Sequence, residues 1–230
     1  MWQIFIDSFI GEKAYINVLE GIAVTIVTAI SALIIGIILG TIVALSRVFK
    51  TKNPLVKVLQ VIAKLYVGFF RGTPIVVQLL FIYFVIFPII GLGLMNVMVV
   101  GIIIFGLNSG AYVSEIMRAG ILSVDKGQNE AGRALGLTYT TTLFKVILPQ
   151  AIKNVIPTIA NEFVSLLKET SVLSFIGIMD LTKALREIGA ANYEFTIPYL
   201  VLAIIYLILV MIATSIVKII ETRLRRNERQ

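Results

Sequence analysis

Residues 196–220 read TIPYLVLAIIYLILVMIATSIVKII and contain one charged side chain, Lys218. Roughly 20 mostly apolar residues let a helix cross the hydrocarbon core of a bilayer, so this stretch predicts a transmembrane helix. The rest of the chain is similar, because 58% of its 230 residues are hydrophobic, 14% are charged and the mean hydropathy is +0.98. Soluble domains carry about a quarter charged residues. The composition therefore excludes an ordinary soluble enzyme, a disordered linker and a disulfide-built secreted domain.

Four further apolar stretches precede this one, at residues 18–46, 55–88, 96–115 and 151–167. We expect residues 55–88 to form one long helix, bent near Gly72-Thr73-Pro74, and Pro157 to kink the fourth span, because an interior proline removes a backbone hydrogen bond. The prediction is an all-α fold: a polytopic membrane helix bundle of about five transmembrane helices, forming a single domain over residues 1–230.

The net charge of +7 is compatible with a nucleic-acid partner or with the anionic inner face of a membrane. With five spans, thirteen of the twenty Lys and Arg residues fall on one side of the membrane. They are Arg47, Lys50, Lys52, Lys57, Arg118, Lys126, Arg133, Lys145, Lys218, Arg223, Arg225, Arg226 and Arg229. Cytoplasmic loops carry an excess of basic residues. The pattern therefore predicts a multi-pass protein with its N-terminus outside and its C-terminus in the cytosol, in contact with lipid and not with nucleic acid.

Residues 123–149 form a long polar segment between the third and fourth predicted spans. We predict a short helix over residues 126–135. Asp125 and Gln128 resemble a capping box at its start, and Gly136 suits its end because glycine readily adopts the left-handed conformation found there. The segment is thus expected to be folded and to lie under the membrane on the cytosolic side.

Thr138 is expected to cap a second short helix that stops before Pro149. Small residues on one face of this segment would let another protein approach closely. They are Ala131, Gly132, Ala134 and Gly136. The residues alone leave two interpretations open, a docking surface and a solvated connector without a partner.

Glu130-Ala131-Gly132, Gly136 and Leu148-Pro149 keep the spacing of the EAA loop of ATP-binding cassette importer permeases, with Gly132 at the third alanine and Val146 at the isoleucine position. Other segments resemble one subfamily, the permeases for polar amino acids. They are FRGTP at 70–74, AYVSEIMRAG at 111–120, GQNEA at 127–131 and KETSV at 168–172. The resemblance extends from about residue 18 to residue 220.

This resemblance implies a function and a set of partners. The loop would form a coupling helix on a separate ATPase subunit, with contacts from Glu130, Ala131, Gly132, Arg133 and Gly136. Two permease subunits would enclose the translocation path, and an extracytoplasmic binding protein would deliver an amino acid. The chain has no Gly-x-x-x-x-Gly-Lys-[Ser/Thr] phosphate loop, so ATP and Mg would be bound by the ATPase partner. The absence of Cys and His removes thiol nucleophiles, His-based acid–base chemistry and most zinc sites. The resemblance therefore implies no catalytic residue, metal site or cofactor in this chain, and we expect that it is not itself an enzyme.

Polar side chains recur on one face of two predicted spans. They are Asn108, Tyr112 and Glu115 in the third span, and Thr158, Glu162, Ser165 and Glu169, with Asn161 beside them, in the fourth. Such groups are costly within a membrane and usually face the bundle interior or a cavity. The predicted substrate-binding residues are Asn108, Tyr112, Thr158, Asn161, Glu162 and Ser165. Among them Glu162 would bind a substrate cation through charge-assisted hydrogen bonds, which favours a basic amino acid.

Other interpretations of the same residues stay open. The polar groups could instead satisfy one another across helices, and the spacing of Glu115 and Arg118 predicts a structural ion pair. An ATP-independent carrier or channel could use the same intramembrane groups, and a membrane scaffold without transport is a third possibility. The pairs Gly36/Gly40 and Gly106/Gly110 have the small-xxx-small spacing of close helix packing, which is a weak signal in a glycine-rich membrane chain.

Overall fold

The computed structural model describes residues 2–48, 53–93 and 95–227, with side chains as far as Arg223. The helices are α1 (Trp2–Ile6), α2 (Tyr15–Val48), α3 (Pro54–Gly72), α4 (Ile75–Phe81), α5 (Phe87–Ile89), α6 (Val97–Ser123), α7 (Lys126–Ala134), α8 (Tyr139–Thr142), α9 (Leu148–Glu169), α10 (Leu181–Asn192) and α11 (Thr196–Asn227). Over the described ranges there is no β-strand, so the predicted all-α fold is confirmed. Lys50, Lys52 and Arg229 of the topology prediction lie outside the described residues.

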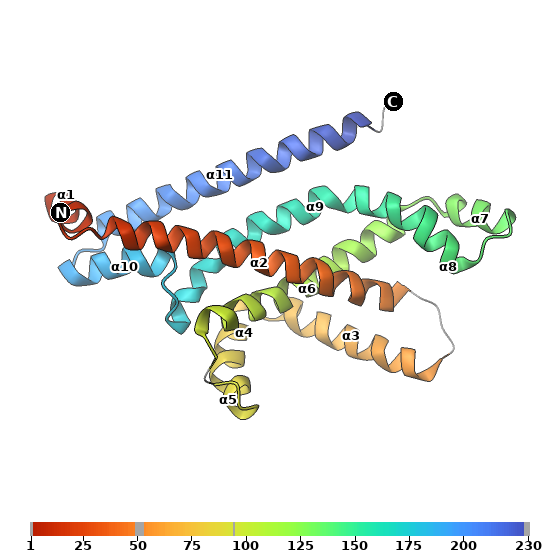
Figure 1. Cartoon of the computed structure of the whole chain (residues 1–230), viewed down its shortest axis with the longest axis horizontal. Helices are drawn as coiled ribbons and strands as arrows, with labels where there is room; N and C mark the ends of the chain where they lie inside the picture. The colour runs from red at the N-terminus through yellow and green to blue at the C-terminus, as the bar shows by residue number, and fades with distance from the viewer. Residues whose placement is uncertain (1, 49–52, 94, 228–230) are drawn as a thin grey trace.

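The long helices α2, α6, α9 and α11 run along one axis of an elongated bundle (Figure 1). Helices α1 and α10 lie at one end, which we call the α10 end; α7 and α8 lie at the other, the α7 end. Four helical segments are long and apolar enough to cross a membrane, and the bent pair α3 and α4–α5 brings the number to five if it forms one span. The described chain starts at the α10 end, and α11 runs toward the α7 end, as an odd number of spans requires.

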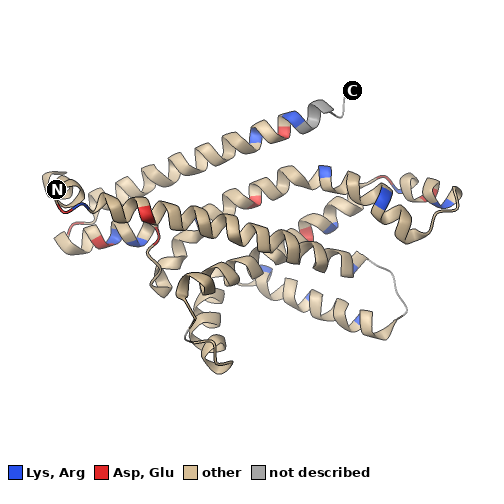
Figure 2. Cartoon of the chain, viewed as in Figure 1, with Lys and Arg blue, Asp and Glu red and all other residues tan. Residues whose placement is uncertain are grey.

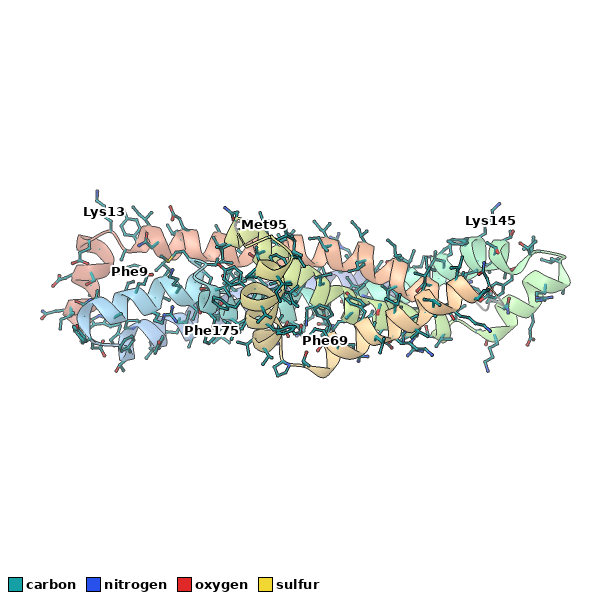
Figure 3. The ribbon with its side chains drawn as sticks, turned by 90° about the horizontal axis from the view of Figure 1, so that it is seen from below. Phe9, Lys13, Phe69, Met95, Lys145 and Phe175 are labelled. Atoms are coloured by element: carbon teal, nitrogen blue, oxygen red, sulfur yellow. The ribbon has the colours of Figure 1, made fainter. Side chains whose placement is uncertain are left out.

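Charged residues concentrate toward the two ends of the bundle, and the middle of the long helices is largely uncharged (Figure 2). Lys13 and Lys145 lie at opposite ends of the long axis (Figure 3). Large apolar side chains remain exposed along the outside of the bundle, for example Ile204, Leu207 and Met211 on α11. An exposed apolar belt between two charged ends is the surface that a bilayer requires.

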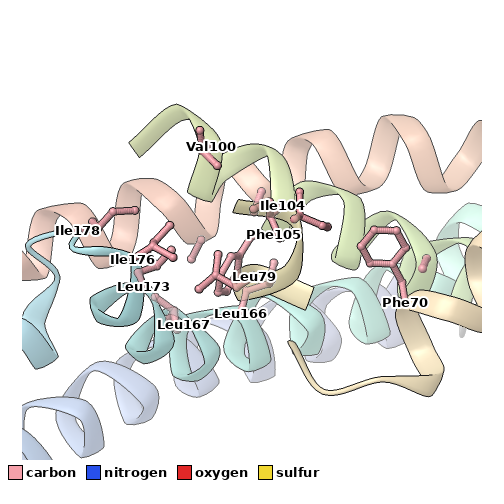
Figure 4. Packing of buried hydrophobic residues seen from close by; sticks show 14 of the residues in the cluster. Phe70, Leu79, Val100, Ile104, Phe105, Leu166, Leu167, Leu173, Ile176 and Ile178 are labelled. Carbon is pink, nitrogen blue, oxygen red and sulfur yellow. The ribbon is translucent and has the colours of Figure 1, made fainter. Parts of the chain in front are cut away.

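Glycines let α2 and α6 pack closely. A Cβ atom added to Gly36 would lie 2.5 Å from Ser109 Oγ, and one added to Gly40 would lie 2.8 Å from the Gly110 carbonyl oxygen. On the other helix, a Cβ on Gly106 would lie 2.6 Å from a side-chain carbon of α2. The two small-xxx-small pairs therefore face each other, and the packing role predicted for them is confirmed. Beside this interface, α6 packs with α9 and the end of α3 around a buried apolar cluster (Figure 4).

The bend predicted near Gly72-Thr73-Pro74 is confirmed, but it is a break and not a bend within one helix: Pro54–Gly72 and Ile75–Ile89 meet at 113°. Thr73 is extended, with φ −127° and ψ 150°, because the ring of Pro74 disfavours helical backbone in the residue before it. The Gln78 side chain then reaches back and donates to the Phe70 and Thr73 carbonyl oxygens, both at 2.8 Å. The corner is sharp because the prolyl ring breaks the helix and a buried amide satisfies the freed carbonyl groups.

The prediction that the helix after Thr138 stops before Pro149 is wrong, because one helical segment continues from Tyr139 to Ile176. A proline ring crowds the carbonyl group four residues earlier, which for Pro149 belongs to Lys145. That residue lies in a π-helical turn, Leu143–Ile147, whose wider i→i+5 spacing accommodates the ring. Pro157 lies inside the same continuous helix, in α9.

Candidate functional site

Three arginines surround one carboxylate where α2, α3 and α6 meet. Glu115 on α6 accepts a hydrogen bond from Arg47 of α2 and two from Arg118, at 3.0 Å from Nε and 2.8 Å from Nη2. Arg71, at the end of α3, lies 3.9 Å from Glu115 Oε2. The Glu115 side chain is only 16% exposed. The predicted ion pair with Arg118 is confirmed, and it belongs to a larger cluster that ties three helices together.

Asn108 lies on a buried face of α6, with only 3% of its surface exposed. Its Nδ2 donates to Gln78 Oε1 at 2.8 Å and contacts the Phe70 carbonyl oxygen at 3.5 Å. Asn108 and Gln78 thus connect α6 to the corner between α3 and α4. The hydrogen bonds of this predicted substrate residue are used inside the protein, as the alternative of mutual satisfaction across helices anticipated.

Tyr112 is half-buried one turn further along α6 and supports Arg71. The guanidinium carbon of Arg71 lies 5.6 Å from the centre of the Tyr112 ring, in a cation–π contact. Arg71 in turn lines an open cavity of about 490 Å³ between α3, α6 and α9. The polar walls of this cavity also include Glu115, Arg118, Ser123, Asn154 and Thr158. Of the six predicted substrate residues, all within the described ranges, Thr158 alone lines this cavity.

Glu162 lies one turn beyond Thr158 on α9 and is half-buried. Its carboxylate lies beside the Ser109 hydroxyl group of α6 and within electrostatic reach of Glu169. Ser165 is half-buried on the same helix, whereas Asn161 is exposed. Among the ion pairs of the described residues none involves Glu162. The structure therefore contains an acidic group within a candidate membrane span that is not neutralised by a nearby base.

The polar segment at the α7 end folds as a helix with defined caps. Asp125 accepts a hydrogen bond from the Gly127 N–H at 2.6 Å, so it caps α7 as predicted. The Gln128 side chain does not complete the capping box, because its Oε1 accepts from Gln150 at 3.3 Å. Gly136 has φ +76°, and the next N–H bonds back to the Gly132 carbonyl oxygen at 3.0 Å, which is a Schellman ending. The predicted stop at Gly136 is confirmed.

Of the small residues in this segment, Gly132 is packed against the rest of the chain and the others are exposed to solvent. A Cβ atom on Gly132 would lie 2.6 Å from Thr142 Cγ2, so Gly132 allows α7 to pack on α8 of the same chain. Glu130, Ala131 and Arg133 are exposed on the other side of α7, together with Ala134 and the loop residue Gly136. Leu135, at the tip, is 80% exposed. The outer side of α7 and the turn that follows it are therefore open to solvent.

The chain matches the family described as "Binding-protein-dependent transport system inner membrane component" over residues 32–226. It is 42% identical over 210 residues to the "Putative glutamine transport system permease protein GlnP" of Rickettsia conorii, covering 91% of this chain and 94% of that protein. The chain belongs to this family. It is therefore the permease subunit of an ATP-binding cassette importer and a multi-pass protein of the bacterial inner membrane, working with an ATPase subunit and a substrate-binding protein.

Two further relatives of this permease are named for other substrates. The "Arginine transport system permease protein ArtQ" of Bacillus subtilis is 39% identical over 92% of this chain and 94% of its own length. The "L-cystine transport system permease protein TcyB" of the same organism is 44% identical over 90% of this chain and 86% of its own length. The names of similar permeases thus differ in the substrate and agree in the type of protein.

Solved structures confirm the fold of the permease. A chain of the "Crystal structure of an amino acid ABC transporter with histidines" superimposes with a TM-score of 0.82 at 36% identity, covering 92% of this chain and 95% of that one. A chain of the inward-facing MetNI methionine ABC transporter gives a TM-score of 0.68 at 18% identity, covering 91% and 98%. The polytopic helical bundle is therefore confirmed for the permease.

Sequence reasoning did not predict the roles of Gln78, Arg47 and Arg71. Gln78 is an amide inside an otherwise apolar run, a position at which a polar group needs a partner, so its position could have indicated a buried contact. The two arginines come from α2 and α3, distant in sequence from Glu115, and their approach depends on how the helices fold back.

Proposed function

We propose that this permease carries amino acids, with basic amino acids preferred, and that two permease subunits enclose the path. Glu162 supports the preference, because it is a carboxylate in a candidate span with no ion pair among the described residues. A substrate cation would neutralise this charge through charge-assisted hydrogen bonds. The names of the relatives, which include glutamine, arginine and L-cystine, support amino acids as the class.

The α7 end is the cytosolic end in this proposal, and the α10 end faces outward. Helices α2 and α6 end at the α7 end, and α3 begins there. The sequence segments at these points, together with the C-terminal segment from Lys218 onward, carry thirteen of the twenty Lys and Arg residues, as cytoplasmic segments of membrane proteins usually do. The ATPase, which binds ATP and Mg, would contact the permease here, and the binding protein would approach the α10 end.

Helix α7 would couple the permease to the ATPase through the exposed residues Glu130, Ala131, Arg133 and Gly136. Gly132 would contribute indirectly, since it holds α7 against α8 through its contact with Thr142. The rigid Schellman ending and the packing on α8 favour a helix that moves as one body with α9, because α8 and α9 belong to one continuous helical segment.

The substrate class is tested by ATP-dependent uptake in proteoliposomes that contain the permease, its ATPase and its binding protein. Uptake of radiolabelled arginine is measured in competition with lysine, histidine and glutamine. We expect lysine to compete strongly and glutamine weakly. Equal competition by glutamine would reject the basic preference, and uptake that survives removal of ATP and the ATPase would support an ATP-independent carrier instead.

The coupling role is tested by Glu130→Arg, with Lys145→Glu as the matched control. Both variants reverse one exposed charge at the α7 end, and Lys145 lies outside α7. We expect Glu130→Arg to lose copurification with the ATPase and ATP-dependent uptake, whereas Lys145→Glu retains both. Unchanged ATPase association in Glu130→Arg would show that this face of α7 is not the contact.

A further inference from the structure

The arginine cluster contains more positive charge than Glu115 can neutralise. Three guanidinium groups from three helices surround one carboxylate, and Arg47 and Arg118 make hydrogen bonds to it. Arg71 stays 3.9 Å from Glu115 Oε2, an ion-pair distance that is too long for a hydrogen bond, and its side chain is 45% exposed. Arg71 is thus the arginine of this cluster whose donors are available to a further anion.

Arg71 lines the cavity between α3, α6 and α9, so an anion bound there can reach its available N–H donors. Tyr112 contacts the guanidinium group at 5.6 Å from the ring centre. This cation–π contact engages the face of the ring and is not a hydrogen bond to an oxygen acceptor, so the N–H donors of the guanidinium group stay available to an anion. Ser123, Asn154 and Thr158 add neutral polar groups to the cavity wall, and its volume of about 490 Å³ is typical of small-molecule sites.

The cavity is adjacent to Glu162. Thr158, which lines it, lies four residues before Glu162 on α9, a rise of about 6 Å along a helix. The carboxylate of Glu162 and the cavity that Arg71 of α3 lines therefore follow one another along the same side of α9. This is the charge pattern that the two ends of an amino acid would require.

We propose that Arg71, held by Tyr112, binds the α-carboxylate of the amino acid as it passes from Glu162 into this cavity. The inference rests on the proposed function, since it assumes that an amino acid travels along this side of α9. Glu162 would then bind the cationic part of the substrate, and Arg71 would recognise the group that all amino acids share. Arg47 and Arg118 would remain paired with Glu115.

The test measures binding to the purified permease–ATPase complex without the binding protein, so that recognition by that protein does not contribute. Radiolabelled L-arginine and L-glutamine are displaced by the unlabelled amino acid and by its carboxamide, L-argininamide or L-glutaminamide, which lacks the carboxylate. We expect the amide to bind at least about tenfold more weakly than the acid, as loss of a charge-assisted hydrogen bond predicts.

Variants then assign this preference to one side chain. In Arg71→Gln the acid and the amide should bind equally, and in Arg71→Lys an intermediate preference should remain because the charge is kept. Lys64→Gln is the matched control, an exposed basic residue two turns earlier on α3 that is not part of the cavity wall. It should retain the full preference.

The outcomes separate this inference from the proposed function. Equal binding of acid and amide by the unmodified complex overturns the inference without any variant, and so does a full preference in Arg71→Gln. Binding of glutamine in place of arginine contradicts the basic preference, yet the acid–amide comparison with glutamine still tests Arg71. Absence of binding for both amino acids, in a complex that still takes them up when its binding protein is added, overturns this inference and leaves the proposed function standing.

Discussion

Glu115 and Glu162 are half-buried glutamates of two neighbouring helices, and the charges around them differ. Glu115 on α6 lies among Arg47, Arg71 and Arg118. Glu162 on α9 lies beside a serine hydroxyl group and within reach of a second acid, Glu169. The first carboxylate has more positive charge around it than it can neutralise, and the second has no base near it in the described structure.

This difference separates a structural charge from one that is available for binding. A buried ion pair whose partners are both present is weak evidence for stability, but removal of one partner leaves the other charges unpaired. Glu115 is therefore a structural charge at the junction of α2, α3 and α6, whose removal would leave three arginines without their acid. An intramembrane carboxylate without a base usually marks a path or a ligand site, which is the role we propose for Glu162.

The largest expected effect is that of Glu115→Gln on stability. The substitution leaves three arginines without their acid at a site where the glutamate side chain is only 16% exposed. We expect a loss of about 3 kcal/mol, the lower end of the range for breaking a buried ion pair, because Arg71 and Arg118 are partly exposed. The thermal unfolding of the detergent-solubilised permease measures it. An unchanged unfolding temperature would show that the cluster does not hold the three helices together.

Glu162→Gln should weaken the affinity for arginine and leave the stability of the permease unchanged, the opposite of what we expect for Glu115→Gln. Loss of a charge-assisted hydrogen bond to a substrate cation corresponds to about a 10- to 100-fold weaker apparent affinity for arginine. The unfolding temperature should stay nearly unchanged, since no ion pair of the described residues is broken. Arginine uptake over a range of concentrations, together with thermal unfolding, separates the two effects. Intact arginine transport in Glu162→Gln would show that the assignment of Glu162 is wrong.

Asn108→Leu tests a neutral contact on the same helix as Glu115. The substitution leaves the buried Gln78 Oε1 without its donor, and an unpaired neutral polar group costs about 1 to 2 kcal/mol. The loss of unfolding free energy should therefore be smaller than in Glu115→Gln. The matched control is Asn161→Leu, an exposed amide on α9, which should leave the unfolding temperature unchanged. A loss in Asn108→Leu larger than in Glu115→Gln would mean that the helix corner, and not the charge cluster, dominates the stability of this region.

Much of the fold could be predicted from local sequence. The apolar stretches predict the spans because a bilayer requires a minimum length of apolar helix. Gly136 predicts the end of α7 because glycine readily adopts the left-handed conformation, and its φ of +76° confirms it. Local sequence could not predict, however, that the helix breaks sharply at Pro74 but continues through Pro149. Both positions contain a proline in an apolar run, and the outcome depends on neighbouring features that the hydropathy pattern does not reveal: the hydrogen bonds of the Gln78 side chain in one case and a π-helical turn in the other.

The candidate site shows the same limit. Helical spacing places Asn108, Tyr112 and Glu115 on one face, but spacing does not say which neighbours that face meets. In the folded chain Asn108 meets Gln78, Tyr112 meets Arg71 and Glu115 meets three arginines. Only Arg118 belongs to α6 itself, and its pairing with Glu115 follows from spacing; Gln78, Arg71 and Arg47 come from other helices, so long-range packing assigns these roles.

The smallest expected effect is that of Glu187→Gln, which extends the comparison to an exposed carboxylate at the α10 end. Glu187 lies 3.7 Å from Lys183 on α10, and its side chain is 46% exposed. Lysine precedes glutamate in this pair, which is the less favourable order in a helix, and Lys183 Nζ already donates to the Gly177 carbonyl oxygen at 2.8 Å. We therefore expect a change of no more than about 0.3 kcal/mol and unaltered arginine uptake. Thermal unfolding of Glu187→Gln beside Glu115→Gln measures how strongly the value of a carboxylate depends on its surroundings. A similar loss in the two variants would mean that the unfolding temperature reports net charge, and the stabilising role of Glu115 could then not be attributed to its arginine neighbours.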